Sequence, residues 1–255
     1  SARPALSANA LGGGIEVWIV IAVTAFAAGF VRGLAGFGLS VVLVPVLGNF
    51  IAPPLAVLVG NLTLFGVGLT DIGRIRRDAD KSALPIALLA LVAVPPGLYL
   101  VTALKPDWAR FLIALVSLGS FVLVVTPLGP LRMPRWPAMT LSGLATGFFG
   151  GFAGMPGPGM APFYLRGRLS PAAARASMMA IFLVVAPLSS ALFIATGTGG
   201  WPQVALALAL LPVMMAGDWL GHRAYGRVTE RQWRLSVFAL LGATALVSLA
   251  RLAGL

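Results

Sequence analysis

The sequence predicts an all-α polytopic membrane protein made of two inverted-topology repeats, each a glycine-rich broken helical hairpin followed by three transmembrane helices. Three observations support this prediction. The chain is 59% hydrophobic and only 10% charged, with a mean hydropathy of +0.97. Several apolar runs are long enough to cross a membrane, and two glycine-rich stretches resemble each other. A soluble domain carries about 25% charged residues, so lipid must replace water over most of this surface.

The composition also excludes several kinds of function. The chain has no cysteine and a single histidine, His222, so imidazole or thiolate metal centres are not expected. No cofactor, no catalytic residue and no metal ligand is predicted. The net charge of +11 comes from basic residues in short loops between apolar runs, which is typical of an inner-membrane protein and not of a nucleic-acid-binding surface.

The expected organisation follows the apolar pattern from one end of the chain to the other. Residues 1–14 are small and lack the features of a signal peptide, so they are expected to form a flexible lead-in. The first repeat is then residues 15–127, the connecting loop 128–137, and the second repeat 138–255.

Single spans are predicted where about 20 apolar residues occur together, and helix is the state that satisfies their backbone in lipid. These predicted spans are 53–70, 83–104, 108–127, 176–196, 201–221 and 234–251. The regions 15–48 and 138–165 are too long for one crossing. Each is cut by glycines, so each is expected to fold as a hairpin of two short helices.

The two glycine-rich regions are related by an offset of 118 residues. Six identities fall within ten positions: Ala27, Gly29, Phe30, Gly33, Ala35 and Gly36 match Ala145, Gly147, Phe148, Gly151, Ala153 and Gly154. Ordered glycine matches are hard to obtain by chance, so an internal duplication is expected.

Loop charges predict how the repeats cross the membrane. If both glycine-rich regions are hairpins, loops 71–82, 128–137, 166–175 and 222–234 share one side. That side then carries thirteen Lys and Arg residues against four on the other. Single crossings would divide these residues eight against nine. The positive-inside rule therefore favours hairpins, which makes the repeats inverted and places both termini in the periplasm.

The hairpin breaks are expected to form the functional centre. The stretch "GMPGPG" at 154–159 cannot continue a helix, and interrupted segments at matching positions of inverted halves indicate a transporter's central site. The second half of each broken helix begins with unpaired N–H groups that favour an anion. Substrate contacts are predicted from Gly36, Phe37, Gly38, Ser40, Gly154, Gly157, Gly159 and Met160. Gly29, Gly33, Gly147 and Gly151 are spaced for close helix packing.

Four further polar residues complete the predicted site. Arg32 lies beside the first break, where it either binds the anion or extends to lipid headgroups. Asn61 is expected to find partners on other helices. Asp71 and Asp218 are candidate proton-coupling residues. The alternative is interfacial pairing, of Asp71 with "RIRR" at 74–77 and of Asp218 with His222 or Arg223.

At these breaks the sequence resembles the sulfite exporter TauE/SafE family of bacterial membrane permeases. The resemblance rests on "GFVRGLAGFGLSVVLVPVL" at 29–47 and "GFFGGFAGMPGPGMAPFYL" at 147–165, and the paired halves cover the whole chain. It implies transport of small sulfur-containing or other organic anions, such as sulfite, sulfonates like sulfoacetate, or related carboxylates.

The leading hypothesis is therefore a secondary transporter of such an anion in the bacterial inner membrane, working by alternating access. No nucleotide-binding motif occurs, so coupling to protons or to the membrane potential is expected. An anion channel built on the same broken helices is the alternative. A membrane enzyme is disfavoured by the scarcity of paired carboxylates within the spans. The expected partners are the anion and the lipid bilayer, and a homodimer is left open.

Overall fold

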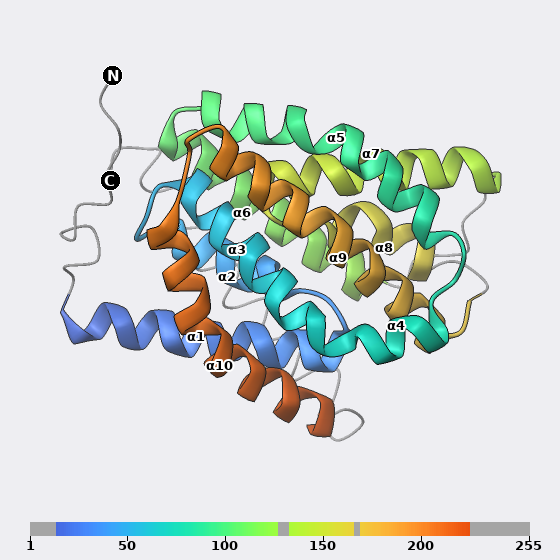
Figure 1. Ribbon diagram of the computed structural model, residues 1–255, viewed down its shortest axis with the longest axis horizontal. Coiled ribbons are helices and arrows are strands. Elements are labelled where there is room, and N and C mark those ends of the chain that lie inside the picture. The colour runs from blue at the N-terminus through green and yellow to red at the C-terminus, as the bar shows by residue number, and fades with distance from the viewer. Residues whose placement is uncertain (1–13, 127–132, 166–168, 225–255) are drawn as a thin grey trace.

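The computed structural model describes residues 14–126, 133–165 and 169–224, which form helices joined by short turns, with no strand among them (Figure 1). The helices are α1 Ile15–Ala35, α2 Leu39–Leu47, α3 Pro53–Gly68, the 3₁₀ turn η2 Leu69–Asp71, α4 Ile72–Asp78, α5 Ala83–Ala103, α6 Pro106–Val125, α7 Arg135–Ala153, α8 Gly157–Leu165, α9 Pro171–Ala195 and α10 Trp201–Ala224. The predicted all-helical class is confirmed for these residues. The expected span 234–251 and residues 1–13 lie outside them.

Length and hydropathy make the molecule a multi-pass membrane protein. Within the described residues, five segments are long and apolar enough to cross a membrane: 15–34, 53–78, 83–103, 171–195 and 201–224. Large apolar side chains also point outward, as Val92 and Tyr99 of α5 do with 70% and 72% of their surface exposed. Such an outer surface suits lipid and not water.

Both glycine-rich regions are interrupted, as the sequence predicts. The helices α1 and α7 end where Gly36 and Gly154 adopt left-handed backbone, with φ of 82° and 64°. Glycine adopts this conformation without a steric penalty, and it ends a helix. The first helices are longer than expected, with 21 and 19 residues. Gly29 and Gly33 remain helical, so the break comes only at Gly36.

The helix boundaries repeat with the same offset of 118 residues that relates the sequences. The helices α2, α3 and α5 begin at Leu39, Pro53 and Ala83, and α8, α9 and α10 begin at Gly157, Pro171 and Trp201. The helices α2 and α8 also have the same length, nine residues each. Three helices of the second half thus begin 118 residues after three helices of the first, in the same order.

Each long helix beside a break packs along a helix of the other half. The most extensive pairings are α1 with α10 and α5 with α7. A Cβ built on Gly29 or Gly33 of α1 would overlap a backbone carbonyl oxygen of α10. On α7, Gly147 and Gly151 face carbonyls of α5 in the same way. The predicted small-residue packing is confirmed, because these glycines let the helix backbones touch.

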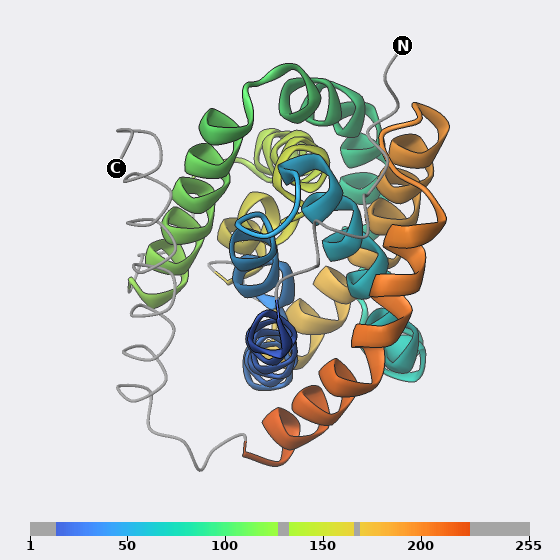
Figure 2. The same cartoon turned by 90° about the vertical axis from the view of Figure 1, so that its left-hand side faces the viewer.

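The short helix α2 lies in the interior, where the end-on view shows it enclosed by other helices (Figure 2). Every side chain of α2 is buried. Pro45 has no N–H to donate to the Val41 carbonyl, and the hydroxyl of Ser117 on α6 donates to that oxygen instead, at 2.5 Å. A neighbouring helix therefore completes the backbone bonding of α2.

Candidate functional site

A buried cluster of charges joins α1, η2 and α10. Arg32 lies in the last turn of α1 and is 1% exposed. Its Nη1 donates to Asp218 Oδ1 at 2.7 Å, and its Nη2 forms an ion pair with Asp71 Oδ2. Asp71 is fully buried and Asp218 nearly so. The close glycine packing of α1 on α10 places Arg32 within reach of Asp218.

Two side chains connect this cluster to the surface. Arg74 Nη1 donates to Asp71 Oδ1 at 2.8 Å and lies 2.9 Å from His222 Nε2. His222 Nδ1 lies 2.9 Å from the Asp218 carbonyl oxygen and 3.4 Å from Asp218 Oδ2. The Arg74 side chain is about half exposed, at 49%. The charges therefore form a continuous chain from the interior to one end of the molecule.

This arrangement bears on the alternatives left open by the sequence. Arg32 is buried in protein and does not extend to the surface. Asp71 pairs with Arg74 of the "RIRR" stretch, and Asp218 contacts His222, which are partners that the alternative to proton coupling names, but both carboxylates are buried. The sequence did not reveal that both carboxylates also pair with Arg32. They lie 39 and 186 residues away from it in the chain.

A second, uncharged group of polar side chains lies deeper along α3. Asn61 Nδ2 donates to Ser189 Oγ of α9 at 3.1 Å and to the Gly150 carbonyl of α7 at 3.3 Å. The expectation that Asn61 finds partners on other helices is confirmed. Thr63 bonds the carbonyls of its own helix, as small hydroxyls on membrane helices usually do.

Several buried polar atoms in the described part of the chain have no hydrogen-bond partner. They are Arg32 Nε, Ser40 Oγ, Asn61 Oδ1 and Thr146 Oγ1. Such atoms are rare in native proteins because each costs about 1–3 kcal/mol. Three of them belong to residues that the sequence predicted as ligands. Thr146 was missed, because a threonine on a membrane helix has an ordinary role in bonding its own backbone.

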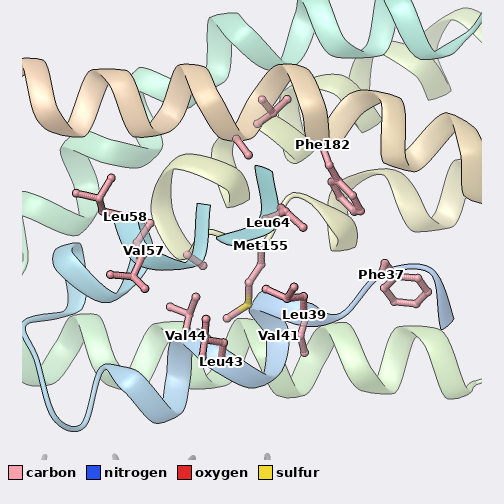
Figure 3. Close-up of a cluster of buried hydrophobic side chains, with 14 of the residues drawn as sticks. Phe37, Leu39, Val41, Leu43, Val44, Val57, Leu58, Leu64, Met155 and Phe182 are labelled. Carbon is pink, nitrogen blue, oxygen red and sulfur yellow. The ribbon is translucent and has the colours of Figure 1, made fainter. Parts of the chain in front are cut away.

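The two breaks meet in the core. A Cβ on Gly157 would lie 3.7 Å from the Phe37 ring, so the second break lies against the first. A Cβ on Gly154 would lie 3.5 Å from the Val44 side chain of α2, and Met155 of the second break belongs to the same buried cluster as Leu39 and Val41 (Figure 3). No side chain caps the N-terminus of α2. Apolar side chains fill the space around both breaks, since Phe37, Met155 and Phe182 are all buried.

The remaining predicted ligands lie at the two breaks. Gly154 ends α7, and Gly157 begins α8. Gly159 packs directly against the backbone at Thr146, and Met160 is fully buried. Gly36 and Gly38 occupy the matching break between α1 and α2, both with left-handed backbone.

The predicted site residues thus fall into two groups. Ten residues separate Asn61 from Asp71, which is about 15 Å along helical backbone. One group is the charged cluster of Arg32, Asp71 and Asp218. The other is the set around the two breaks, including Ser40 and Asn61. Arg32 connects the two groups, because its carbonyl accepts from the N–H of Gly36 at the first break.

A further polar network holds the loop between α4 and α5. The Asp80 N–H donates to Ser177 Oγ at 2.8 Å, and Ser82 Oγ lies 3.1 Å from the Tyr164 hydroxyl of α8. Hydrogen bonds from Ser82 lower the pKa of Asp80, and the charge of Arg135 adds to this effect. This network fixes the loop to α8 and α9.

Over the described ranges, no group of three or more His, Asp or Glu side chains is arranged to hold a metal ion. The charged cluster combines two carboxylates with two guanidinium groups, and so it is suited to anions that compete with those carboxylates.

Comparison with known proteins adds one match. The model of the TauE family, described as sulfite exporter TauE/SafE, matches residues 21–248. Comparison with curated proteins finds no match, and neither does comparison with solved structures.

Proposed function

Because the chain belongs to the sulfite exporter TauE/SafE family, whose members are membrane transporters of sulfur-containing anions and not enzymes, we propose that it is a secondary transporter working by alternating access. Its substrate is a small sulfur-containing or organic anion, such as sulfite, a sulfonate like sulfoacetate, or a related carboxylate. One observation carries the proposal. Two helix breaks at equivalent positions meet in the core, beside buried polar atoms that have no partner.

The two halves are inverted repeats. Support comes from the common offset of the helix boundaries and from the reciprocal pairing of α1 with α10 and α7 with α5. The directions of the helices agree with this inversion, since α1 and α3 run from left to right in Figure 1 while α7 and α9 run from right to left. Inverted repeats give a transporter two related conformations, open to opposite sides.

The anion binds between the two breaks. The uncapped N-terminus of α2 offers N–H groups, with Gly38 and Ser40 beside them, and Gly157, Gly159 and Met160 of α8 form the opposite wall. Ser40 Oγ can donate to the anion, while Asn61 Oδ1 can accept from a protonated one. The apolar side chains between the breaks, Phe37 and Met155 among them, move aside when the anion enters.

Arg32 supplies the positive charge at the edge of this site. Both of its Nη atoms are held by Asp71 and Asp218, but its Nε has no partner in the described structure and can donate to an anion oxygen. An arriving anion competes with the two carboxylates for Arg32. Protonation of Asp218 or Asp71 weakens their hold on Arg32, which couples proton binding to anion binding.

The protein resides in the bacterial inner membrane, with its basic loops in the cytoplasm and both termini in the periplasm. The oligomeric state, including a homodimer, does not enter the mechanism.

Flux measurements in proteoliposomes test this function. We expect saturable uptake of labelled sulfite or sulfoacetate that is accelerated by unlabelled substrate on the opposite side. A thermal-shift screen of sulfonates, sulfite, sulfate and short carboxylates should identify the ligand, because a ligand stabilises the folded state by mass action. Flux that neither saturates nor shows exchange would instead support an anion channel, a function against which the filled core argues.

A further inference from the structure

A pocket of about 240 Å³ opens where α4, the beginning of α9 and the end of α10 meet. Its lining consists of Arg74, Arg77, Arg175 and His222, the acidic Asp78, and the apolar side chains of Ala172, Ala176 and Met179. None of the three arginines was predicted as a ligand. In the sequence they are loop charges, and Arg74 and Arg77 belong to the "RIRR" stretch expected to pair with Asp71.

The pocket carries an excess of positive charge. Three guanidinium groups face one carboxylate, and that carboxylate is paired with Arg77, whose Nε lies 3.1 Å from Asp78 Oδ1. Guanidinium groups converging on a concave surface favour oxyanions, which they bind through paired N–H donors.

The pocket is also the outer face of the buried charge cluster. Arg74 and His222 line it and at the same time contact Asp71 and Asp218. Arg175 Nη2 donates to the Gly33 carbonyl at 3.3 Å. A Cβ added to Gly36 would collide with the Arg175 side chain, so this arginine covers the beginning of the first break. An anion in the pocket would therefore lie one layer of side chains from Arg32.

We propose that this pocket is an outer docking site for the transported anion on the basic face of the molecule. Its preferred ligand is a short-chain organic sulfonate or carboxylate. The arginines hold the oxyanion, the wall of Ala172, Ala176 and Met179 holds the carbon chain, and the volume exceeds what a bare inorganic anion fills. The ligand class rests on the proposed function.

Docking also prepares the next step of transport. An anion bound to Arg74 competes with Asp71 for that guanidinium, and one beside His222 competes with Asp218. Occupation of the pocket therefore loosens the ion pairs that hold Arg32. The docked anion and the opening of the buried cluster are thus linked through the same side chains.

Calorimetric titration of ethanesulfonate into the full chain, purified in detergent with phosphatidylcholine, tests the site. We expect Arg77→Gln, whose side chain is 73% exposed and not needed for folding, to weaken binding about threefold, and Arg175→Gln to weaken it about tenfold. Arg76→Gln is the matched control, because it removes the same charge from the next position of α4 outside the pocket. Sulfate should bind more weakly than ethanesulfonate.

The outcomes separate this proposal from the proposed function. Ethanesulfonate binding that is unchanged in Arg77→Gln and Arg175→Gln overturns the docking site and leaves a transporter with its ligand elsewhere. Weaker binding in these variants, together with no exchange flux in proteoliposomes, keeps the docking site and overturns the transporter. Sulfate binding as tight as ethanesulfonate overturns the organic preference. The titration is repeated in nanodiscs that contain phosphatidylglycerol. If this lipid abolishes the part of ethanesulfonate binding that depends on Arg77, the occupant of the pocket is a lipid headgroup, which also overturns the proposal.

Discussion

Arg32 illustrates what a charge within a membrane protein requires. A charged side chain at bilayer depth costs about 2.5–3.5 kcal/mol on insertion scales, and it is retained where it has partners. Arg32 has two, Asp71 and Asp218, and Arg74 and His222 support those carboxylates from the outside. Arg32 is the member that both buried carboxylates share, so its removal deprives both of an ion-pair partner.

We predict that Arg32→Gln lowers the thermal unfolding midpoint in detergent strongly, because it leaves two carboxylates buried without their shared partner. Breaking a buried ion pair costs about 3–5 kcal/mol. The double variant with Asp71→Asn should lose less than the sum of the two single variants, because the second change removes one of the stranded charges. A fluorescence-monitored melt measures both effects. A midpoint for Arg32→Gln equal to that of wild type would contradict the pairing.

Asp218 is the residue at which we expect proton binding to be coupled to anion transport. We expect Asp218→Asn to abolish transport driven by a pH gradient while exchange of anion for anion continues, because exchange needs no net movement of protons. Asp107→Asn is the control, since this carboxylate is exposed and pairs with Arg110 of its own helix. Flux measured across a range of pH, with and without a gradient, checks the prediction. An unaltered pH profile would remove Asp218 from the coupling mechanism.

At the scale of the element, the glycines have two separate roles. Gly36 and Gly154 end their helices through left-handed backbone. Gly29 and Gly147 stay helical and instead allow two helices to touch. The sequence predicted both the breaks, between Gly36 and Ser40 and within "GMPGPG", and the close packing at the earlier glycines. A glycine with left-handed backbone ends its helix, whereas a glycine that stays helical and faces a carbonyl of a second helix allows the two helices to pack closely.

Features that depend on neighbouring residues could be predicted from the sequence, whereas contacts between distant residues could not. Short-range chemistry predicted the break at "GMPGPG", the unpaired N-terminus of α2 and the need of Asn61 for partners. The pairing of Arg32 with Asp218 depends on how α1 packs on α10, which no local pattern encodes. Arg175 carried no signal beyond its charge. Its role arises from its contact with Gly33, 142 residues away.

We predict that Gly29→Ala and Gly147→Ala each destabilise the protein by about 1–3 kcal/mol, because the new methyl group would overlap a carbonyl oxygen of the facing helix. Gly119→Ala is the control. It lies within α6 with nothing within 4 Å of the added Cβ, and it should be neutral or slightly stabilising. Thermal melts of the three purified variants compare them directly. Equal midpoints for all three would show that the helices do not touch at these glycines.

At the scale of the whole molecule, the distribution of charge and the order of helices support the proposed inversion of the two halves. The basic residues Arg74, Arg77 and Lys81 lie around α4, at the right-hand end of Figure 1, where α3 leads into α5. The turn between α9 and α10 occupies the matching position in the second half but lies at the left-hand end. Duplicated elements that end on opposite sides are what an inverted repeat requires.

Cysteine labelling tests this arrangement, because the chain has no cysteine of its own. We introduce Lys81→Cys between α4 and α5 and Thr196→Cys between α9 and α10, two exposed positions in corresponding turns of the two halves. A membrane-impermeant thiol reagent applied to intact spheroplasts should label Thr196→Cys, and it should label Lys81→Cys only after the membrane is opened. Two parallel repeats would place both turns on one side, and both variants would then label together. The labelling pattern therefore decides whether the two halves face opposite ways, which the proposed alternating-access mechanism requires.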